Sequence, residues 1–194
     1  MVMKNRLVII LIAVLLGGCA SSGSSYSEKS IPKEELLLNL NYKAAESLIS
    51  KSGTSLDKTI PLVIATIVNI DNLESSSTLG RTISEQVSSK FTQAGYSMVE
   101  MKFHNAVYMQ QNEGEMVLTR EIREIAHSHQ AQAVIVGTYS KADKNVYVNL
   151  KIVQPDRGRV ISACDYIIPR SPDVNIMIKS RESYNNNGGY NFYK

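Results

Sequence analysis

The side chains that most often perform catalysis or bind metals are scarce in this sequence, which has two cysteines and three histidines. His127 and His129 are two positions apart, so a helix would direct them to different faces, unlike the i,i+4 pair of an H-E-x-x-H zinc helix. We expect them instead to be basic residues near a helix C-terminus, where a cation is favourable. The sequence has no phosphate-binding loop, nucleophile elbow or H-E-x-x-H motif. These residues predict no enzyme activity, no metal site and no cofactor.

One cysteine lies where a lipid could be attached. Residues 1–6 are basic, and residues 7–16 form an unbroken apolar run. Ten helical residues, rising ~1.5 Å each, reach about half of the ~30 Å hydrocarbon core, so the run predicts a signal peptide rather than a transmembrane helix. The sequence Leu-Gly-Gly-Cys at residues 16–19 then resembles the lipobox of bacterial lipoproteins. A plain secreted protein with a chance cysteine is the alternative.

The lipobox resemblance implies that residues 1–18 are removed and that Cys19 carries acyl chains. Several acyl chains hold a protein on a membrane far more firmly than one myristoyl chain, whose binding is marginal. Residue 20 is Ala and not Asp, so the lipoprotein sorting rule implies the outer membrane of a Gram-negative cell, with its lipids as the partner of Cys19. Cys164 then has no cysteine to pair with, and its apolar, alternating surroundings predict a buried, inert thiol.

The charge of the chain argues against a nucleic-acid partner. Loss of the signal peptide removes Lys4 and Arg6 and lowers the formal net charge from +3 to +1, whereas nucleic-acid-binding domains are usually basic. The residues after Cys19 are rich in Ser, which is typical of a flexible tether, and the C-terminal residues are rich in Asn, Gly and Tyr. The mature chain is therefore expected to consist of a tether, one domain and a flexible tail, at residues 19–32, 33–170 and 171–194.

The best candidate for a binding site is the loop 71–77, which follows a predicted central strand. Open α/β sheets bind ligands beyond the carboxyl ends of such strands. A capped turn before the next helix is the alternative, with no binding role. Arg81 would lie in the first turn of that helix, where a cation opposes the helix dipole. Glu85 four residues on, Asp71 or a carboxylate of a partner is expected to offset its charge. The candidate interface or pocket residues are Asp71, Glu74, Ser76, Arg81 and Glu85.

Hydrophobic periodicity predicts the elements that position this loop. Apolar residues at helical spacing indicate three amphipathic helices, at 33–51, 79–94 and around 118–126. Two continuous, β-branched runs, at 62–68 and 133–139, are typical of strands buried on both faces. Alternating runs indicate strands with one buried face, at 98–103, 144–153 and 160–168.

The order of these elements predicts the fold class. The chain should be a single α/β (α+β) domain with a mixed five-stranded sheet and three helices. The two continuous strands should be central and the strand 98–103 should lie at an edge, which together with right-handed crossovers gives the strand order 2-1-3-4-5. The first three strands should be parallel, and the last three should form an antiparallel meander with short turns.

The same segments resemble the FlgO family of flagellar outer-membrane lipoproteins over roughly residues 34–169. The matching pieces are Leu48-Ile49-Ser50-Lys51, Ala65 to Val68 with Asp71 and Leu73, Ser76 to Arg81, Glu85-Gln86, Gly95-Tyr96, Val99-Glu100, Ala131 to Tyr139 and Asp165-Tyr166. Their order along the chain, together with the lipobox, carries the resemblance. It implies a structural protein that acts with other flagellar outer-membrane and basal-body proteins and supports motility. The family has no catalytic residues to transfer, and homo-oligomers are possible.

Two other functions are compatible with the sequence. One is a pore- or secretion-associated lipoprotein similar to curli-type secretion subunits, but no spare pair of long alternating segments is left over for a membrane hairpin. The other is a periplasmic ligand-binding lipoprotein that uses the loop 71–77. We favour a lipid-anchored, flagellum-associated structural protein over both.

Overall fold

The computed structural model describes residues 35–73, 76–99, 109–112, 115–118 and 120–179. The expected signal peptide, Cys19, tether and Glu74 lie outside these residues, as do residues 100–103 of the second predicted strand and residues 180–194. Among the helices of the described residues, none is long and apolar enough to cross a membrane.

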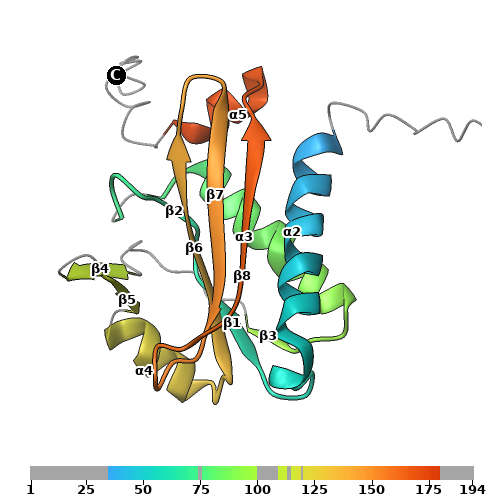
Figure 1. Ribbon diagram of the computed structural model, residues 1–194, viewed down its shortest axis with the longest axis vertical. Coiled ribbons are helices and arrows are strands. Elements are labelled where there is room, and N and C mark those ends of the chain that lie inside the picture. Colours follow the sequence, from blue (N-terminus) through green and yellow to red (C-terminus); the bar gives the residue numbers. More distant parts are fainter. Residues whose placement is uncertain (1–34, 74–75, 100–108, 113–114, 119, 180–194) are drawn as a thin grey trace, which may run out of the picture. The chain divides into compact units, whose positions relative to one another are not determined.

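The described residues form an α+β domain with one mixed sheet (Figure 1). The helices are α2 (Leu36–Ser52), α3 (Thr78–Gln93), α4 (Arg120–Ser128) and α5 (Pro172–Ile178), with a short 3-10 helix η2 (Gly53–Ser55) after α2. The strands of the sheet are β1 (Leu62–Ile64), β2 (Val68–Asn69), β3 (Met98–Val99), β6 (Ala133–Lys141), β7 (Asn145–Val153) and β8 (Val160–Pro169). A separate hairpin consists of β4 (Met109–Asn112) and β5 (Glu115–Leu118).

The strand order of the sheet is β3-β1-β6-β7-β8. Strands β3, β1 and β6 are parallel, whereas β6, β7 and β8 are antiparallel. This confirms the predicted order 2-1-3-4-5 and the predicted parallel and antiparallel parts. The continuous apolar runs are central because both faces of those strands are covered, and β3 is at an edge, as expected.

The first predicted strand differs from expectation because it is broken into β1 and β2. Ile64 pairs with Ile135 and Val68 with Thr138, so four steps on one strand oppose three on the other. The extra residue makes a bulge, which leaves a backbone N–H without a partner in the ladder. A hydroxyl of α3 replaces that partner, because Ile67 N donates to Ser84 Oγ at 3.0 Å.

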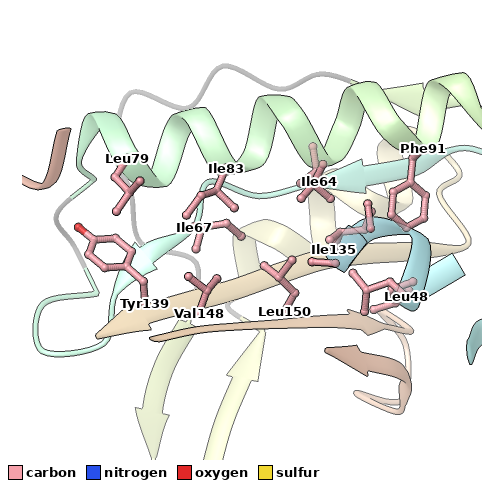
Figure 2. Packing of buried hydrophobic residues seen from close by; sticks show 14 of the residues in the cluster. Leu48, Ile64, Ile67, Leu79, Ile83, Phe91, Ile135, Tyr139, Val148 and Leu150 are labelled. Carbon is pink, nitrogen blue, oxygen red and sulfur yellow. The ribbon is translucent and has the colours of Figure 1, made fainter. Parts of the chain in front are cut away.

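One face of the sheet is covered by α2, α3 and α5 and holds the larger part of the core (Figure 1). Apolar residues recur every four positions along α3, so they form one stripe. Figure 2 shows Leu79, Ile83 and Phe91 pointing from α3 toward the strand residues Val148 and Leu150. All five side chains are fully buried. The stripe read from the sequence is therefore the contact surface of this helix.

A buried polar contact also joins the two long helices to the sheet. The amide of Asn41 on α2 is fully buried, and it donates to Gln86 Oε1 on α3 at 2.6 Å and accepts from the hydroxyl of Tyr166 on β8. Burial, and to a lesser degree the neighbouring Cys164, raises the pKa of Tyr166. Cys164 itself is half-buried against the core rather than fully buried.

A smaller apolar cluster lies on the other face of the sheet, beneath α4. Ile122 and Ala126 of this helix pack against the strand residues Val134 and Val136. The helix begins at Arg120 and covers only part of this face (Figure 1). His127 lies in its last turn, as predicted, with Nε2 3.2 Å from Asp156 Oδ1.

The predicted domain boundary at residue 170 is wrong, because α5 follows it. Ser171 caps this helix by accepting from Val174 N at 3.2 Å, and Pro172 occupies the first turn, where its missing N–H costs nothing. Val174 and Ile178 are buried against the core. A seven-residue helix offers too few turns for a periodic pattern to be recognised, so its burial decides its structure. The hairpin of β4 and β5 is likewise an addition to the predicted elements.

Candidate functional site

The predicted loop leads into the first turn of α3, which lies unusually close to the sheet. Ser77 is the N-cap, and its Oγ accepts from Gly80 N at 3.1 Å. A Cβ atom on Gly80 would collide with the carbonyl oxygen of Ile67 in the bulge between β1 and β2. Only glycine can stand at this point of the helix without moving the strand. Close packing of α3 against the strand therefore requires the glycine in the Leu-Gly-Arg segment of residues 79–81.

A tyrosine of the central strand β6 holds the same turn in place. The hydroxyl of Tyr139 donates to Ser77 Oγ at 2.7 Å, and the backbone carbonyl oxygen of Tyr139 accepts from Ile70 N at 2.9 Å. Burial raises the pKa of Tyr139, against smaller lowering effects of Ser77 and of the charge of Arg81. A hydroxyl that stays protonated and hydrogen-bonded in this way has a structural role. Both ends of the loop 71–77 are thus attached to one residue of the sheet.

Arg81 is exposed at the start of α3 and contacts the loop rather than Glu85. Its guanidinium donates to Ser76 Oγ and to Thr78 Oγ1, each at 3.1 Å. Among the residues that the structure describes, no ion pair joins it to Glu85, which points into solvent. In this way two hydroxyl oxygens stabilise a cation that the helix dipole disfavours at this position.

The structure therefore brings together only part of the predicted site. Ser76 and Arg81 are in contact, whereas Asp71 is exposed and ends a turn in which its N–H donates to Asn69 Oδ1 at 3.2 Å. Glu74 lies outside the described residues. Within those residues, no three His, Cys, Asp or Glu side chains lie close enough together to hold a metal ion.

A hollow of about 330 Å³ lies on the part of the sheet that α4 leaves uncovered. Its lining comes from four strands or their ends, β2, β6, β7 and β8, and sequence reasoning did not single it out. Thr138, Asn149 and Asp165 are neighbours in the strand register, and Asn149 Nδ2 donates to Asp165 Oδ1 at 2.8 Å. The residues around it are Ile70, Val136, Gly137, Thr138, Asn149, Lys151 and Asp165.

Exposed apolar side chains form a row beside this hollow. Tyr147 pairs with Ile167 in the register of β7 and β8, and Ile70 follows β2 on the other side of β6. Each of the three exposes more than two fifths of its surface. Single exposed apolar residues are common, but neighbouring ones rimmed by polar groups are typical of an interaction surface. We call the hollow and this row the open face.

The sequence contains a signal for the open face, although an incomplete one. Alternation along β7 places Tyr147, Asn149 and Lys151 opposite the buried set that begins at Val146. A tyrosine and an isoleucine at outward positions were therefore visible in the pattern. Which outward positions α4 covers, and which it leaves open, depends on contacts that the pattern does not contain.

This fold and this site define a class of protein: a small α+β domain with one helix-covered face and one open face of mixed polarity. The family model described as FlgO protein matches residues 42–173, which is more than half of the chain. The chain therefore belongs to the FlgO family.

Several solved structures are similar in fold. The LpoB C-terminal domain from Salmonella enterica is 10% identical, with 69% of this chain and 98% of that chain covered and a TM-score of 0.49. The dodecamer of a PelC variant from Paraburkholderia phytofirmans is 13% identical, with 59% of this chain and 74% of that chain covered and a TM-score of 0.42. Lipoprotein GNA1162 from Neisseria meningitidis is 10% identical, with 59% and 85% covered and a TM-score of 0.39. No curated protein matches the sequence.

Proposed function

We propose that the chain is a structural protein of the flagellar apparatus, anchored by acylated Cys19 in the outer membrane and needed for motility. It would act by binding other flagellar outer-membrane or basal-body proteins and would carry no enzyme activity. Membership of the FlgO family supports the flagellar role. The observation that carries the protein–protein role is the open face, where apolar side chains surround hydrogen-bonding groups.

The open face suits a protein partner in its composition. Ile70, Tyr147 and Ile167 offer apolar surface, whose burial is favourable by about 25 cal/mol per Å². Asn149, Lys151 and Asp165 offer donors and acceptors beside it. Interfaces commonly combine such an apolar centre with polar groups and an aromatic residue such as Tyr147. On the helix-covered face, most apolar side chains of the described residues are already packed in the core.

Deletion of the gene tests the biological role. We expect the deletion strain to swim poorly and to show an altered basal body by electron cryotomography, and the wild-type gene to restore both. Unchanged swimming together with an unchanged basal body would refute the flagellar function.

A substitution on the open face tests the interface. Ile167→Asp should fold normally, because the side chain is 48% exposed, yet fail to restore swimming. Val160→Asp is the matched control, because Val160 is 46% exposed on the same strand β8 but lies at its opposite end. Normal swimming with Ile167→Asp, or equal loss in both variants, would remove the open face from the proposal.

The anchor is tested separately. Cys19→Ala should abolish fatty-acid labelling and leave the precursor uncleaved by the lipoprotein peptidase, because the acylated thiol is what that peptidase recognises in lipoproteins. Cys164→Ala is the control, since that thiol lies in the domain and should not affect acylation. An acylated, membrane-bound Cys19→Ala protein would show that the lipobox assignment is wrong.

A further inference from the structure

We propose that the free edge of β8 pairs with β8 of a second copy of this chain, in an antiparallel ladder centred on Cys164. β8 is the last strand of the sheet, so one of its two sides has no neighbouring strand (Figure 1). The contact is isologous, because each copy contributes the same residues, 162–166. The proposal does not depend on the flagellar role, and it leaves Ile167 outside the paired stretch, on the open face.

The hydrogen bonds at the end of β8 show which backbone groups face the free edge. Just beyond the last register pair of β7 and β8, Arg170 N donates to Lys144 O at 2.9 Å. Because bonded and non-bonded pairs alternate along an antiparallel ladder, the even-numbered residues from 162 to 168 bond to β7. The odd-numbered residues direct their N–H and C=O groups away from β7, and these are Ala163, Asp165 and Ile167.

These outward groups are available for a further strand. Among the described residues, none accepts a hydrogen bond from the backbone N–H of Ala163, Asp165 or Ile167. Ala163 O accepts a long bond of 3.5 Å from Lys51 Nζ on α2, an exposed side chain that can turn away. The ladder has no bulge, and the strand no proline, between residues 162 and 168. A row of unpaired N–H and C=O groups of this kind is a template for strand addition.

Two-fold symmetry allows three registers in the middle of the strand, and the side chains favour one of them. A ladder centred on Asp165 places two carboxylates directly opposite each other, which is destabilising. A ladder centred on Tyr166 places two tyrosines opposite each other and each Asp165 opposite Ile167. A ladder centred on Cys164 places two small thiols opposite each other and Asp165 opposite Ala163 of the second copy. Size and charge therefore select Cys164 as the centre.

Charge complementarity supports the same register. Lys151 is the cross-strand neighbour of Ala163, and no carboxylate within the described part of the chain forms an ion pair with it. In the proposed ladder, Lys151 of the second copy lies in the same row as Asp165, with only the methyl group of Ala163 between them. A lysine stem can extend over such a small apolar group. Asp165 Oδ1 accepts from Asn149 Nδ2 at 2.8 Å, so its second oxygen can accept from that ammonium group.

The proposed ladder joins the open faces of the two copies. Ala163 and Asp165 of opposite copies exchange both of their backbone hydrogen bonds. Since alternate residues of a strand point to the same side, the odd-numbered side chains of both copies lie on one surface. The dimer would therefore present both hollows to a partner on a single continuous sheet.

Oxidation of Cys164 tests the register. In the proposed ladder the two Cys164 residues form a non-hydrogen-bonded pair, whose Cα atoms are about 4.5 Å apart, within the ~4.4–6.8 Å of disulfides. Copper phenanthroline added to cell envelopes that contain the mature, acylated protein should convert most of it to a dimer on a non-reducing gel. Cys164→Ser, which leaves Cys19 as the other cysteine, is the control and should remove the dimer band.

Charge reversal tests whether the contact is made between copies. Lys151→Asp gives the interface carboxylates alone, and Asp165→Lys gives it ammonium groups alone. Each variant should therefore co-purify with a tagged copy of itself several-fold less than the wild-type chain does. Co-expression of the two variants should restore co-purification, because opposite charges again face each other, and this restoration also shows that both variants fold. Lys141→Asp, at an exposed position at the end of β6, is the control and should have no effect.

Four results would overturn the proposal. The first is a wild-type protein that neither forms the disulfide nor co-purifies with its tagged copy. The second is a dimer band of equal strength in Cys164→Ser. The third is a mixed pair of charge variants that co-purifies no better than each variant alone. The fourth is a disulfide from Cys164 to a different protein, which would show that the edge binds another chain. None of these results bears on swimming, so the flagellar function is tested by its own experiment.

Discussion

The two faces of the sheet come from the same alternating strands and differ in what covers them. On β7, Val148 and Leu150 point into the core beneath α2 and α3, whereas Tyr147 and Lys151 point to the face that α4 covers only in part. Val148 and Leu150 stabilise the fold, because their apolar surface is already removed from water. Tyr147 and Lys151 remain free to bind. The function of this domain is therefore to be sought on the face of the sheet that helices cover only in part.

The largest expected effect is on the covered face. Phe91→Ala should lower the free energy of unfolding by about 3–5 kcal/mol, because it leaves a cavity at the end of the α3 stripe. That is a large share of the ~5–15 kcal/mol typical of a domain. Chemical denaturation measures it. Tyr147→Ala on the open face is the comparison and should stay within about 0.5 kcal/mol. Equal losses would show that the two faces do not differ as described.

The close approach of α3 to the bulge should be nearly as sensitive. Gly80→Ala inserts a methyl group against the carbonyl oxygen of Ile67, and overpacking of this kind costs about 1–3 kcal/mol, or more where backbone has to move. Ser89→Ala, at an exposed position of the same helix, is the control and should be neutral or slightly stabilising. A Gly80→Ala protein as stable as wild type would mean that the helix can move away from the strand at little cost.

The buried Tyr166 makes the covered face sensitive to alkaline pH. Burial raises its pKa in the folded state, so the folded protein keeps a proton that the unfolded chain releases above about pH 10. Stability is therefore fully present below that pH and falls as the pH rises above it. Tyr166→Phe should flatten this fall and cost about 1–3 kcal/mol at neutral pH, because Asn41 loses a partner.

The raised pKa of Tyr139 adds to the same alkaline dependence. The double variant Tyr139→Phe with Tyr166→Phe should accordingly show the weakest dependence in denaturation curves recorded on both sides of pH 10. A steep alkaline loss in the double variant would contradict the assignment to these two residues.

The smallest effect on stability is expected for Arg81. Its guanidinium is exposed and bonded to two hydroxyls, and exposed charged contacts contribute only ~0.2–1 kcal/mol. Arg81→Ala should barely move the melting temperature and should weaken assembly if the charge meets a partner, which co-purification and swimming assays measure. A melting temperature as low as that of Phe91→Ala would show that Arg81 is needed for the stability of the fold. Normal assembly would show that its charge only holds the loop.

Much of the fold was predictable because its signals are local or periodic. The stripe of α3 predicts the helix and its buried face, and the two continuous apolar runs predict the central strands. The break between β1 and β2 was not predictable. It depends on Ser84 Oγ accepting a hydrogen bond from the backbone N–H of Ile67, seventeen residues earlier, and on Gly80 allowing the helix to approach. The short α5 depends in the same way on burial of Val174 and Ile178.

The site was predicted less well than the fold. The loop 71–77 was predicted to follow a central strand, but it follows the short strand β2, which pairs only with β6. Ser77 and Arg81 hold the turn of α3, which favours the capped-turn alternative for this part of the loop. The alternation of apolar and polar residues along the strands predicts the open face only as a set of outward-pointing positions. Its hollow lies beside the end of β2 at Asn69, and its lining residues Val136, Asn149 and Asp165 come from the strands β6, β7 and β8.

The signal-peptide and lipobox pattern, the helical stripe of α3 and the family resemblance can be read from the sequence alone, because each rests on local composition or on periodicity. The strand order follows from the order of the elements and from the right-handedness of crossovers. Tertiary structure decided which outward side chains stay exposed, how the bulge is satisfied and where the domain ends. The physical reason is that burial and hydrogen-bond satisfaction are properties of pairs. Tyr139 with Ser77, Ser84 with Ile67 and Asn149 with Asp165 meet only after the chain has folded, and no pattern within one segment encodes its partner.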